Sequence, residues 1–294
     1  MRVNSVQVDN KIISITGKLI KTARIEEEWY HDVENPASLI KGLKESKSGA
    51  DIFTFWQRLP EAKPKYNYYM EWDAIAALPI KSFDYWYKKQ IDNNARRAIK
   101  RAEARGVEVK VANFDDDFVK GMTSIFNETP IRQGKPFWHY GKDMQTVRKE
   151  FSRYLYREDL IGAYYNGELI GFIMLAHAGK YALTGQIISK IAHRDKSPNN
   201  ALIAKAVEFC ENKKIPYLVY FMWGRGSFSE FKRRNGFEKT LLPRYYIPLT
   251  IKGAIALKLH LHHGFVGILP EKLILRLIGL RSKWYARKYQ EHKG

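Results

Sequence analysis

Cysteine is almost absent from this sequence. The 294 residues contain a single one, Cys210, so no disulfide can form within the chain. This usage is typical of a reducing compartment, and the protein is therefore predicted to be cytoplasmic. Cys210 lies on the apolar stripe of an expected helix, where a lone cysteine is more often a packing residue than a nucleophile.

The signatures of several enzyme classes are missing too. The sequence contains no Gly-x-Ser-x-Gly elbow, no Walker loop and no dinucleotide-binding fingerprint. His260, His262 and His263 are close together in the chain, but neither a cysteine nor a suitably spaced carboxylate accompanies them. No metal site is therefore predicted.

Long apolar runs are also lacking. No segment approaches the roughly 20 apolar residues that a membrane-spanning helix needs, and the N-terminus is too polar for a signal peptide. Hydrophobic residues nevertheless make up 45% of the chain and aromatic residues 14%, which indicates an ordered globular protein with a large core.

Acidic residues are few relative to basic ones. Thirty-one Asp and Glu oppose fifty Lys and Arg, which leaves a formal charge of +19. A field of this sign attracts polyanions such as tRNA, the phosphates of coenzyme A, nucleotide-linked precursors or an acidic membrane face. Charge alone does not choose among these partners.

The chain is predicted to divide into a small N-terminal α/β lobe over 1–81, a central domain over 82–250 and a basic helical tail over 251–294. In the first part, residues 11–25 alternate around Gly17 as a hairpin, and 36–45 favour a helix. Residues 50–60 and 66–72 are predicted strands. A long helix with a basic face is predicted from Ser82 to Arg105.

The central domain is predicted to be an α/β fold around a mixed sheet. Asn166-Gly167 predicts a tight hairpin, and the unbroken apolar run 217–222 predicts a central strand buried on both faces. Asn199 or Asn200 is expected to cap the helix that carries Cys210. The predicted strands are Val107–Val111, Leu160–Tyr165, Leu169–Ala176, Ala182–Ile188, Tyr217–Met222 and Tyr245–Pro248.

The order of elements from Tyr181 to Thr250 resembles the second half of the GNAT acyltransferase fold. The donor-binding loop of that fold is matched by Arg194, Lys196, Ala201, Leu202 and Ile203, while Ser197 and Asn199 stand where the family has glycines. Lys232 occupies the place of the family's catalytic tyrosine. A Phe231-Lys232 pair ahead of Gly236 is similar to the FemAB-like branch, as is the basic helix Asn93–Glu103.

The resemblance implies an N-acyltransferase that moves an acyl or aminoacyl group from acetyl-CoA, another acyl-CoA or aminoacyl-tRNA. The implied acceptor is an amine on a small molecule, a peptide or a cell-wall precursor, and no metal is needed. Lys232 would favour the oxyanion. The base stays open among Glu230, His139, Tyr220 and water. Donor binding is assigned to Ile188, Lys190, Arg194, Lys196, Ser197, Asn199 and Asn200.

The aromatic loop 130–142 is expected to cover the acceptor site, with Arg132, Trp138 and Tyr140 as substrate residues. Each of these functional interpretations has a structural alternative. Lys232 can be an ordinary lysine of a basic helix, and the aromatic loop can be a plug over the core. The whole protein can also be a non-catalytic polyanion-binding protein, for RNA or nucleotides, on a GNAT-like scaffold.

The tail is predicted to form two helices separated by Pro270. Its second half carries an apolar stripe and basic flanks, which predict peripheral contact with an anionic membrane or docking on the protein's own N-terminal lobe. The stripe consists of Leu273, Leu277, Leu280 and Trp284 beside Ile274 and Ile278.

Overall fold

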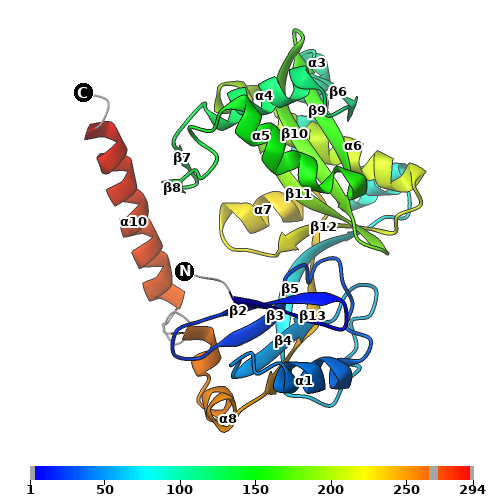
Figure 1. Cartoon of the computed structure of the whole chain (residues 1–294). Coiled ribbons are helices and arrows are strands. Elements are labelled where there is room, and N and C mark those ends of the chain that lie inside the picture. The colour runs from blue at the N-terminus through cyan, green and yellow to red at the C-terminus, as the bar shows by residue number, and fades with distance from the viewer. Residues whose placement is uncertain (1–3, 265–270, 292–294) are drawn as a thin grey trace. The chain divides into compact units, whose positions relative to one another are not determined.

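The computed structural model describes residues 4–264 and 271–291 (Figure 1). They form two compact units. Unit 1 is Met1–Ala74 with Thr240–Leu275, and unit 2 is Ile75–Lys239 with Arg276–Gly294. These limits differ from the predicted boundaries at 81/82 and 250/251. Most of the strand Glu238–Pro248 is grouped with unit 1, because it pairs with the strand Ile52–Trp56 rather than with the sheet of unit 2.

Unit 1 has a sheet with the strand order β1-β2-β3-β4-β13-β5. Its elements are β1 (Asn4–Val8), β2 (Lys11–Thr16), β3 (Thr22–Ile25), α1 (Pro36–Glu45), β4 (Ile52–Trp56), the first part of β5 (Met70–Pro79), β13 (Glu238–Pro248), α8 (Ile251–Lys258) and the 3-10 turn η4 (Leu261–His263). The hairpin around Gly17 and the helix over 36–45 are confirmed. The strand predicted over 66–72 begins later, at Met70.

A buried arginine ties three segments of unit 1 together. Arg244 on β13 donates to Glu28 at 3.0 and 3.2 Å and to Asp73 on β5. Burial opposes its charge, but the two carboxylates outweigh burial and raise the pKa of Arg244 above its ordinary value. Removal of one partner would leave a buried charge unpaired, which is strongly destabilising. This network therefore fixes β13 in unit 1.

Unit 2 has a sheet with the order β5-β12-β11-β10-β9-β6. Its elements are α2 (Phe83–Tyr85), the π-helical turn η1 (Trp86–Gln90), α3 (Asn93–Ala104), β6 (Glu108–Ala112), α4 (Asp116–Phe126), β7 (Ile131–Arg132), β8 (Lys135–Pro136), α5 (Met144–Phe151), η2 (Ser152–Arg157), β9 (Glu158–Tyr165), β10 (Glu168–His177), β11 (Tyr181–Ser189), η3 (Ile191–Lys196), α6 (Pro198–Asn212), β12 (Tyr217–Met222) and α7 (Ser227–Arg234). The helix α10 (Glu271–Glu291) continues into this unit at Arg276.

The mixed sheet of unit 2 is sandwiched between two helical layers (Figure 1). Residues of α4 and α5 pack on one face with β9 and β10, and residues of α3 and α6 pack on the other. The strands predicted within unit 2 are confirmed, each to within two residues, and so is the hairpin at Asn166-Gly167. Cys210 is buried, and burial raises the pKa of its thiol to about 12, as suits a packing residue.

The continuous helix predicted from Ser82 to Arg105 is wrong. Ser82 does cap a helix, but the chain turns out of helical geometry at Ile91, whose ψ is 150°. Asp92 then accepts a bond from the Ala95 N–H at 2.8 Å and starts α3, while its own N–H donates to the Arg234 carbonyl oxygen at 3.0 Å. The break therefore attaches the start of α3 to the end of α7.

The predicted caps of α6 are also wrong. The helix begins at Pro198, after Ser197 in the left-handed conformation with φ 57°, and no side chain caps it. Asn199 and Asn200 lie inside its first turn. Proline is pre-organised for the first helical position, so the helix begins earlier than the asparagines suggest.

The tail begins with α8, which is shorter than predicted and packs into unit 1 at Gly253 beside Asp51. Pro270, predicted to separate two helices, lies outside the described residues. On α10 the apolar stripe is exposed at Leu273, Leu277, Leu280 and Trp284. None of the helices over the described residues is both long enough and apolar enough to cross a bilayer.

Candidate active site

The middle of the unit 2 sheet opens between two parallel strands. β11 and β12 pair at only three positions, the last of which joins Leu183 to Val219. Both strands continue past this point, to Ser189 and Met222, so they separate from Thr184 onward. Crevices at the carboxyl ends of parallel strands are preferred ligand sites.

Two residues at this opening carry unusual local structure. Thr184 is fully buried, and its hydroxyl has no hydrogen-bond partner among the described residues. Phe221 on β12 has φ 47°, a conformation that costs energy for a residue with a large side chain. Unpaired buried groups and backbone strain concentrate at functional sites.

β12 is an interior strand, as predicted, because it lies between β5 and β11. Its burial on both faces holds only for Leu218 and Val219, however, and Met222 is 42% exposed. The loss of burial follows from the separation from β11. The carboxyl end of the strand therefore lines an opening.

Lys232 lies at the β12 side of the opening. The residue is only 3% exposed. Its Nζ donates to the Met222 carbonyl oxygen at 2.5 Å and lies 4.6 Å from the centre of the Tyr220 ring. Burial lowers the pKa of Lys232 to about 8. A surface lysine on a basic helix is therefore ruled out, and the ammonium group is held in place next to β12.

The ring of Tyr220 packs against the ammonium group of Lys232. It is half-buried, and it contacts Phe231 and Phe237 edge to face. Burial raises the pKa of Tyr220 above its ordinary value. Tyr220 is thus a neutral phenol at physiological pH, able to donate a hydrogen bond and unsuited to accept a proton as a base.

Glu158 approaches β11 and is absent from the sequence-based predictions. It is half-buried at the start of β9, and its Oε1 atom lies 3.7 Å from the position that a Cβ on Gly185 would take. Burial raises its pKa to about 7, although Arg157 acts in the opposite direction. A carboxylate that titrates near neutrality can take a proton from an amine.

The other predicted bases fit less well. Glu230 is held by Arg233 and Arg234, whose hydrogen bonds lower its pKa to about 2. His139 is buried and stacks on Phe126 at 4.4 Å, and burial, followed by Lys142, lowers its pKa to about 4. Its neighbours are the rings of the α4 and α5 layer, whereas Lys232 contacts β12. His139 thus packs as an aromatic core residue against Phe126 and Phe151.

The loop 130–142 is anchored to the end of β11. Arg132 donates to the Ser189 carbonyl oxygen at 2.9 Å and to Glu128 at 2.9 Å. Glu128 in turn accepts from the backbone N–H groups of Ile191 and Ala192. Arg132 therefore contacts the turn that follows β11, which is the predicted donor loop, and Glu128 is a further residue that the sequence did not reveal.

The two other predicted substrate residues are exposed. Trp138 is 72% exposed and Tyr140 is exposed as well. The Lys142 Nζ lies 4.0 Å above the Trp138 ring, a cation–π contact. These aromatic side chains are available to a substrate, and their role stays a prediction.

The predicted donor residues surround the turn between β11 and α6. Ile188 is buried, Lys190 forms an ion pair with Glu168, and Arg194 is exposed. Arg105 at the end of α3 binds Asp195 at 2.6 Å, which fixes the position of the turn. Lys196 lies 4.7 Å above the Tyr165 ring and also approaches Asp195.

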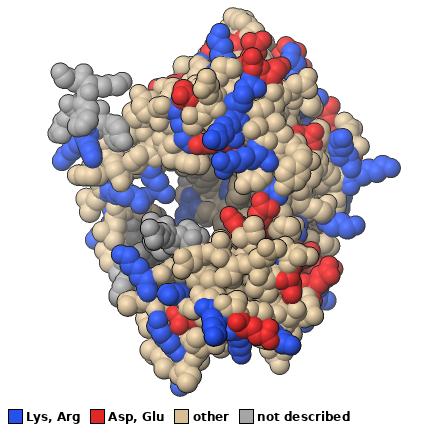
Figure 2. Space-filling model, viewed as in Figure 1, with Lys and Arg blue, Asp and Glu red and all other residues tan. Residues whose placement is uncertain are grey.

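A basic cavity of about 350 Å³ lies between α3, α6 and α7. Its lining includes residues of both segments on which the family resemblance rests, the basic helix Asn93–Glu103 and the segment Tyr181–Thr250. Asn200 donates to Asn235 at 3.1 Å, and Asn235 is fully buried at the end of α7. Around these amides, the side chains with positive charge are Arg97, Arg101 and Arg234. Figure 2 shows basic side chains over the visible face, interspersed with acidic ones.

This cavity contains only some of the residues of the single cleft that was predicted from Arg194 to Lys232. Asn200 and Phe231, the neighbour of Lys232, line it, whereas Arg194 and Lys232 do not. The cavity is suited to hold phosphates, because guanidinium groups bind them in a forked geometry. The continuous cleft stays a prediction.

No protein-family model matches the sequence, and no curated protein matches it. Solved structures do match. FemX is 10% identical over 87% of this chain and 89% of its own, with a TM-score of 0.56. L-PGS from Bacillus licheniformis is 12% identical over 95% and 90%, with a TM-score of 0.58.

The C-terminal domain of a proposed lysylphosphatidylglycerol synthetase from Agrobacterium fabrum is 13% identical over 87% of both chains, with a TM-score of 0.58. At such low identity these likenesses concern the fold. The chain has the mixed α/β fold of these proteins, and the predicted relationship to the FemAB-like branch of the GNAT fold is confirmed at the level of the fold.

Proposed function

We propose that the protein is an acyltransferase that moves an acyl or aminoacyl group from an activated donor to an amine. The observation that carries this proposal is the buried Lys232, which donates to the carboxyl end of β12 beyond the last pair that this strand forms with β11. An ester or thioester donor is already activated. Its transfer needs positioning, a proton acceptor and a charge that favours the tetrahedral oxyanion.

The two titratable groups suit complementary roles. Lys232, with its pKa near 8, is mostly protonated at neutral pH and presents an ammonium group. Glu158, with its pKa near 7, is partly deprotonated at the same pH and can accept the proton of the attacking amine. Both pKa values are shifted toward neutrality, where groups that donate and accept protons in catalysis are typically tuned.

The donor is either an acyl-CoA, such as acetyl-CoA, or aminoacyl-tRNA. Both carry phosphates, and the arginine-lined cavity beside α6 suits either one. The fold shared with FemX and L-PGS favours aminoacyl-tRNA, with a peptide-like or lipid-linked acceptor. A non-catalytic polyanion-binding protein is the alternative function, because the net charge of +19 supports it independently of Lys232 and Glu158.

A donor screen tests the proposal. The melting temperature of the full chain is measured with acetyl-CoA, aminoacyl-tRNA, deacylated tRNA and unrelated RNA at low and high salt. One acylated donor is expected to stabilise the protein beyond its unacylated form, because only that donor fills the opening as well as the basic cavity. Equal stabilisation by every RNA, lost at high salt, would instead support generic polyanion binding.

The exposed stripe of α10 supports a second proposal, attachment to an anionic membrane surface. Leu277, Leu280 and Trp284 are exposed on a helix that also carries basic side chains. Burial of apolar area contributes roughly 25 cal/mol per Å², and a basic residue near anionic lipid adds about 1 kcal/mol. The exposed basic residues of the described helix are Arg276, Arg281, Lys283, Arg287 and Lys288.

Co-sedimentation with anionic and zwitterionic vesicles at low salt is the measurement. Wild type is expected to sediment with anionic vesicles, and Leu277→Asp with Leu280→Asp is expected to lower the bound fraction at least about tenfold. A truncation should follow Leu275, because the preceding residues belong to unit 1. Retention of binding by both variants, or no binding by wild type, would refute membrane attachment by α10.

A further inference from the structure

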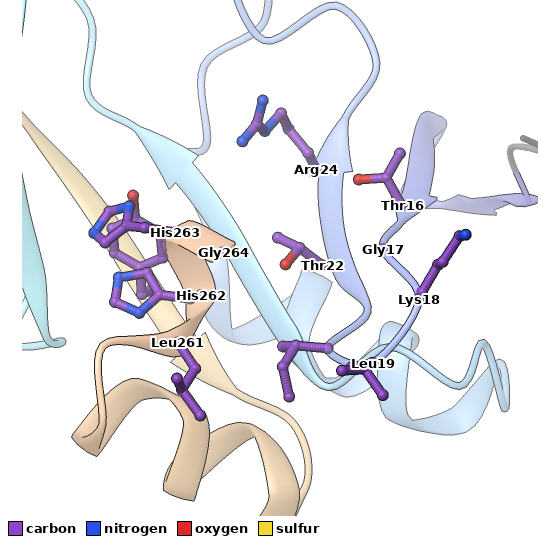
Figure 3. A pocket seen from close by; sticks show the side chains of 12 residues that line it. Thr16, Gly17, Lys18, Leu19, Thr22, Arg24, Leu261, His262, His263 and Gly264 are labelled. Carbon is purple, nitrogen blue, oxygen red and sulfur yellow. The ribbon is translucent and has the colours of Figure 1, made fainter. Parts of the chain in front are cut away.

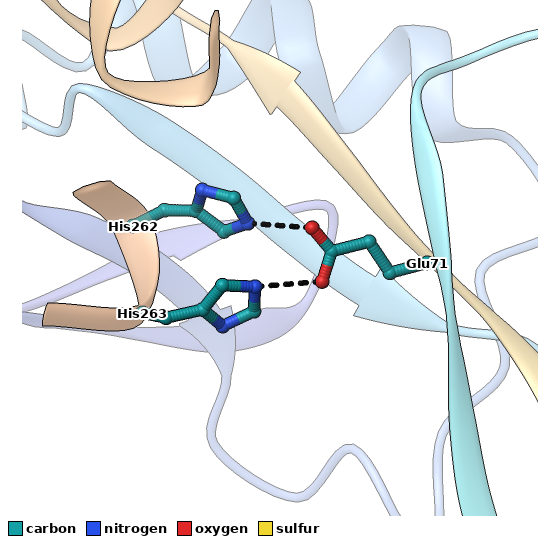
Figure 4. A group of neighbouring side chains, drawn as sticks. All are labelled: Glu71, His262 and His263. Atoms are coloured by element: carbon teal, nitrogen blue, oxygen red, sulfur yellow. Dashed lines mark hydrogen bonds and ion pairs between the residues drawn. The ribbon is translucent and has the colours of Figure 1, made fainter. Parts of the chain in front are cut away.

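Two histidines and a glutamate meet in unit 1. Glu71 is on β5, and His262 and His263 are on η4 (Figure 4). The Nε2 atom of His262 lies 3.0 Å from Glu71 Oε1, and that of His263 lies 2.7 Å from Glu71 Oε2. One ligand atom from each of the three residues lies within 4.8 Å of the others. The carboxylate that the histidine cluster lacks in the sequence is thus supplied from 191 residues away.

The spacing of these atoms is close to that of a metal site. A tetrahedral Zn²⁺ ion with bonds of about 2.0–2.1 Å holds its ligand atoms roughly 3.3 Å apart. The observed separations of 3.0 and 2.7 Å, which join the two imidazoles to different oxygens of Glu71, are about 0.3 and 0.6 Å shorter, so the side chains must move apart by this amount to admit an ion. Two imidazoles and one carboxylate are a common ligand set for Zn²⁺, and they leave one position open.

The surroundings of the cluster hold its side chains in place. The side chain of His262 is only 1% exposed, and its Nδ1 atom has no hydrogen-bond partner among the described residues. The Tyr69 hydroxyl donates to Glu71 at 2.9 Å, and a hydrogen bond of this kind orients a ligating carboxylate.

His262 and His263 also line a cavity of about 640 Å³ together with Tyr246 (Figure 3). Lys18 and Arg24 on the opposite wall are basic, and Thr16 and Thr22 add hydroxyl groups. The cavity beside the two histidines is therefore a space with positive charge. That space suits a water molecule or an anionic group such as a carboxylate or phosphate.

We infer that Glu71, His262 and His263 form a zinc site in unit 1, whose open position takes water or an anionic ligand from the adjoining cavity. This site is independent of the proposed acyl transfer, since all its residues belong to unit 1 and those of the candidate active site to unit 2. Against it stands a simple ion pair between Glu71 and protonated histidines, which needs no metal.

Metal binding by the full chain separates the two. Chelator-treated protein is titrated with Zn²⁺ in a calorimeter and with Co²⁺ in a spectrophotometer. One equivalent of each ion is expected to bind, and Co²⁺ is expected to give the visible absorption of a four-coordinate site. Glu71→Gln and His263→Ala are each expected to weaken Zn²⁺ binding at least about 100-fold, because each removes one of three protein ligands.

His260→Ala is the matched control. His260 is 67% exposed, and its Nδ1 is 4.0 Å from Glu71, beyond ligand distance. This variant is expected to bind Zn²⁺ as wild type does, and Zn²⁺ is expected to raise the melting temperature of wild type and His260→Ala only. His263 is half-exposed in its side chain, so His263→Ala keeps the test decisive if Glu71→Gln does not fold. No binding by wild type, or unchanged binding by His263→Ala, would overturn the zinc site.

Discussion

Replacing Lys232 with methionine is expected to lower kcat about 10²- to 10³-fold, with little loss of thermal stability. Methionine keeps the apolar length of the side chain and removes the ammonium group beside β12. Loss of one oxyanion-stabilising group from an acyl-transfer site has an effect of this size. Lys232→Arg keeps the charge and is the matched control, expected to retain more activity than the methionine variant.

The dependence of kcat on pH separates the two protonation states of Lys232. If the ammonium form stabilises the oxyanion, kcat falls as pH rises through about 8, the pKa of the buried lysine. In Lys232→Arg this decline moves to higher pH, since guanidinium stays charged. A rate that instead rises through pH 8 in wild type would assign the neutral amine as the base and contradict the proposed role.

The stability of the same variants gives a readout that does not depend on activity. The pKa of Lys232 is about 8 in the folded protein and 10.5 ordinarily, so the unfolded chain binds more protons between these values. Lys232 therefore adds a rise of about 3 kcal/mol to the free energy of unfolding of wild type between pH 8 and 10.5, measured as the difference from Lys232→Met. Lys232→Met lacks this rise. Parallel loss of stability and turnover at pH 7 would mark Lys232 as structural.

Reversing the charge of two arginines in the cavity beside α6 is expected to have the second-largest effect. Arg97→Glu with Arg101→Glu should weaken donor binding about 100-fold, since a hydrogen bond to a charged group contributes about 1.5–3 kcal/mol. The slope of log K against log salt should fall by about two. Equilibrium binding of the donor identified in the screen is the measurement, made at several salt concentrations.

The control for this prediction has the same change of net charge. Lys89→Glu with Lys100→Glu alters two exposed lysines of η1 and α3 that do not line the cavity. It is expected to weaken binding by less than about tenfold, through the long-range field alone. If both double variants weaken binding equally, the cavity holds no phosphate and only the overall charge attracts the donor.

The sequence by itself determined most of the individual elements and the class of the fold. Asn166-Gly167 selects one turn type, and its hairpin is present. The apolar run 217–222 is an interior strand, and Gly236, with φ 84°, ends the helix that carries Lys232. These features depend on residues within a few positions of one another, where local conformational preferences decide. The resemblance to the GNAT fold followed from their order.

Local signals failed where two preferences competed. The apolar period from Ser82 to Arg105 is continuous, yet Asp92 caps a new helix and binds the end of α7. Asp92 followed by Asn93 is itself a helix-start signal. Which of the two patterns prevails depends on the contact with Arg234, 142 residues later in the chain, and the tertiary structure decided it.

Only the tertiary structure decided the chemistry around the opening and the cluster in unit 1. Glu158 gains its raised pKa from burial, and its approach to Gly185 requires β9, β10 and β11 to be assembled. Glu71 reaches His262 and His263 only because β5 and η4 meet. A side chain's pKa and its capacity to bind a ligand depend on neighbours and desolvation, and the long-range pairing of strands supplies both.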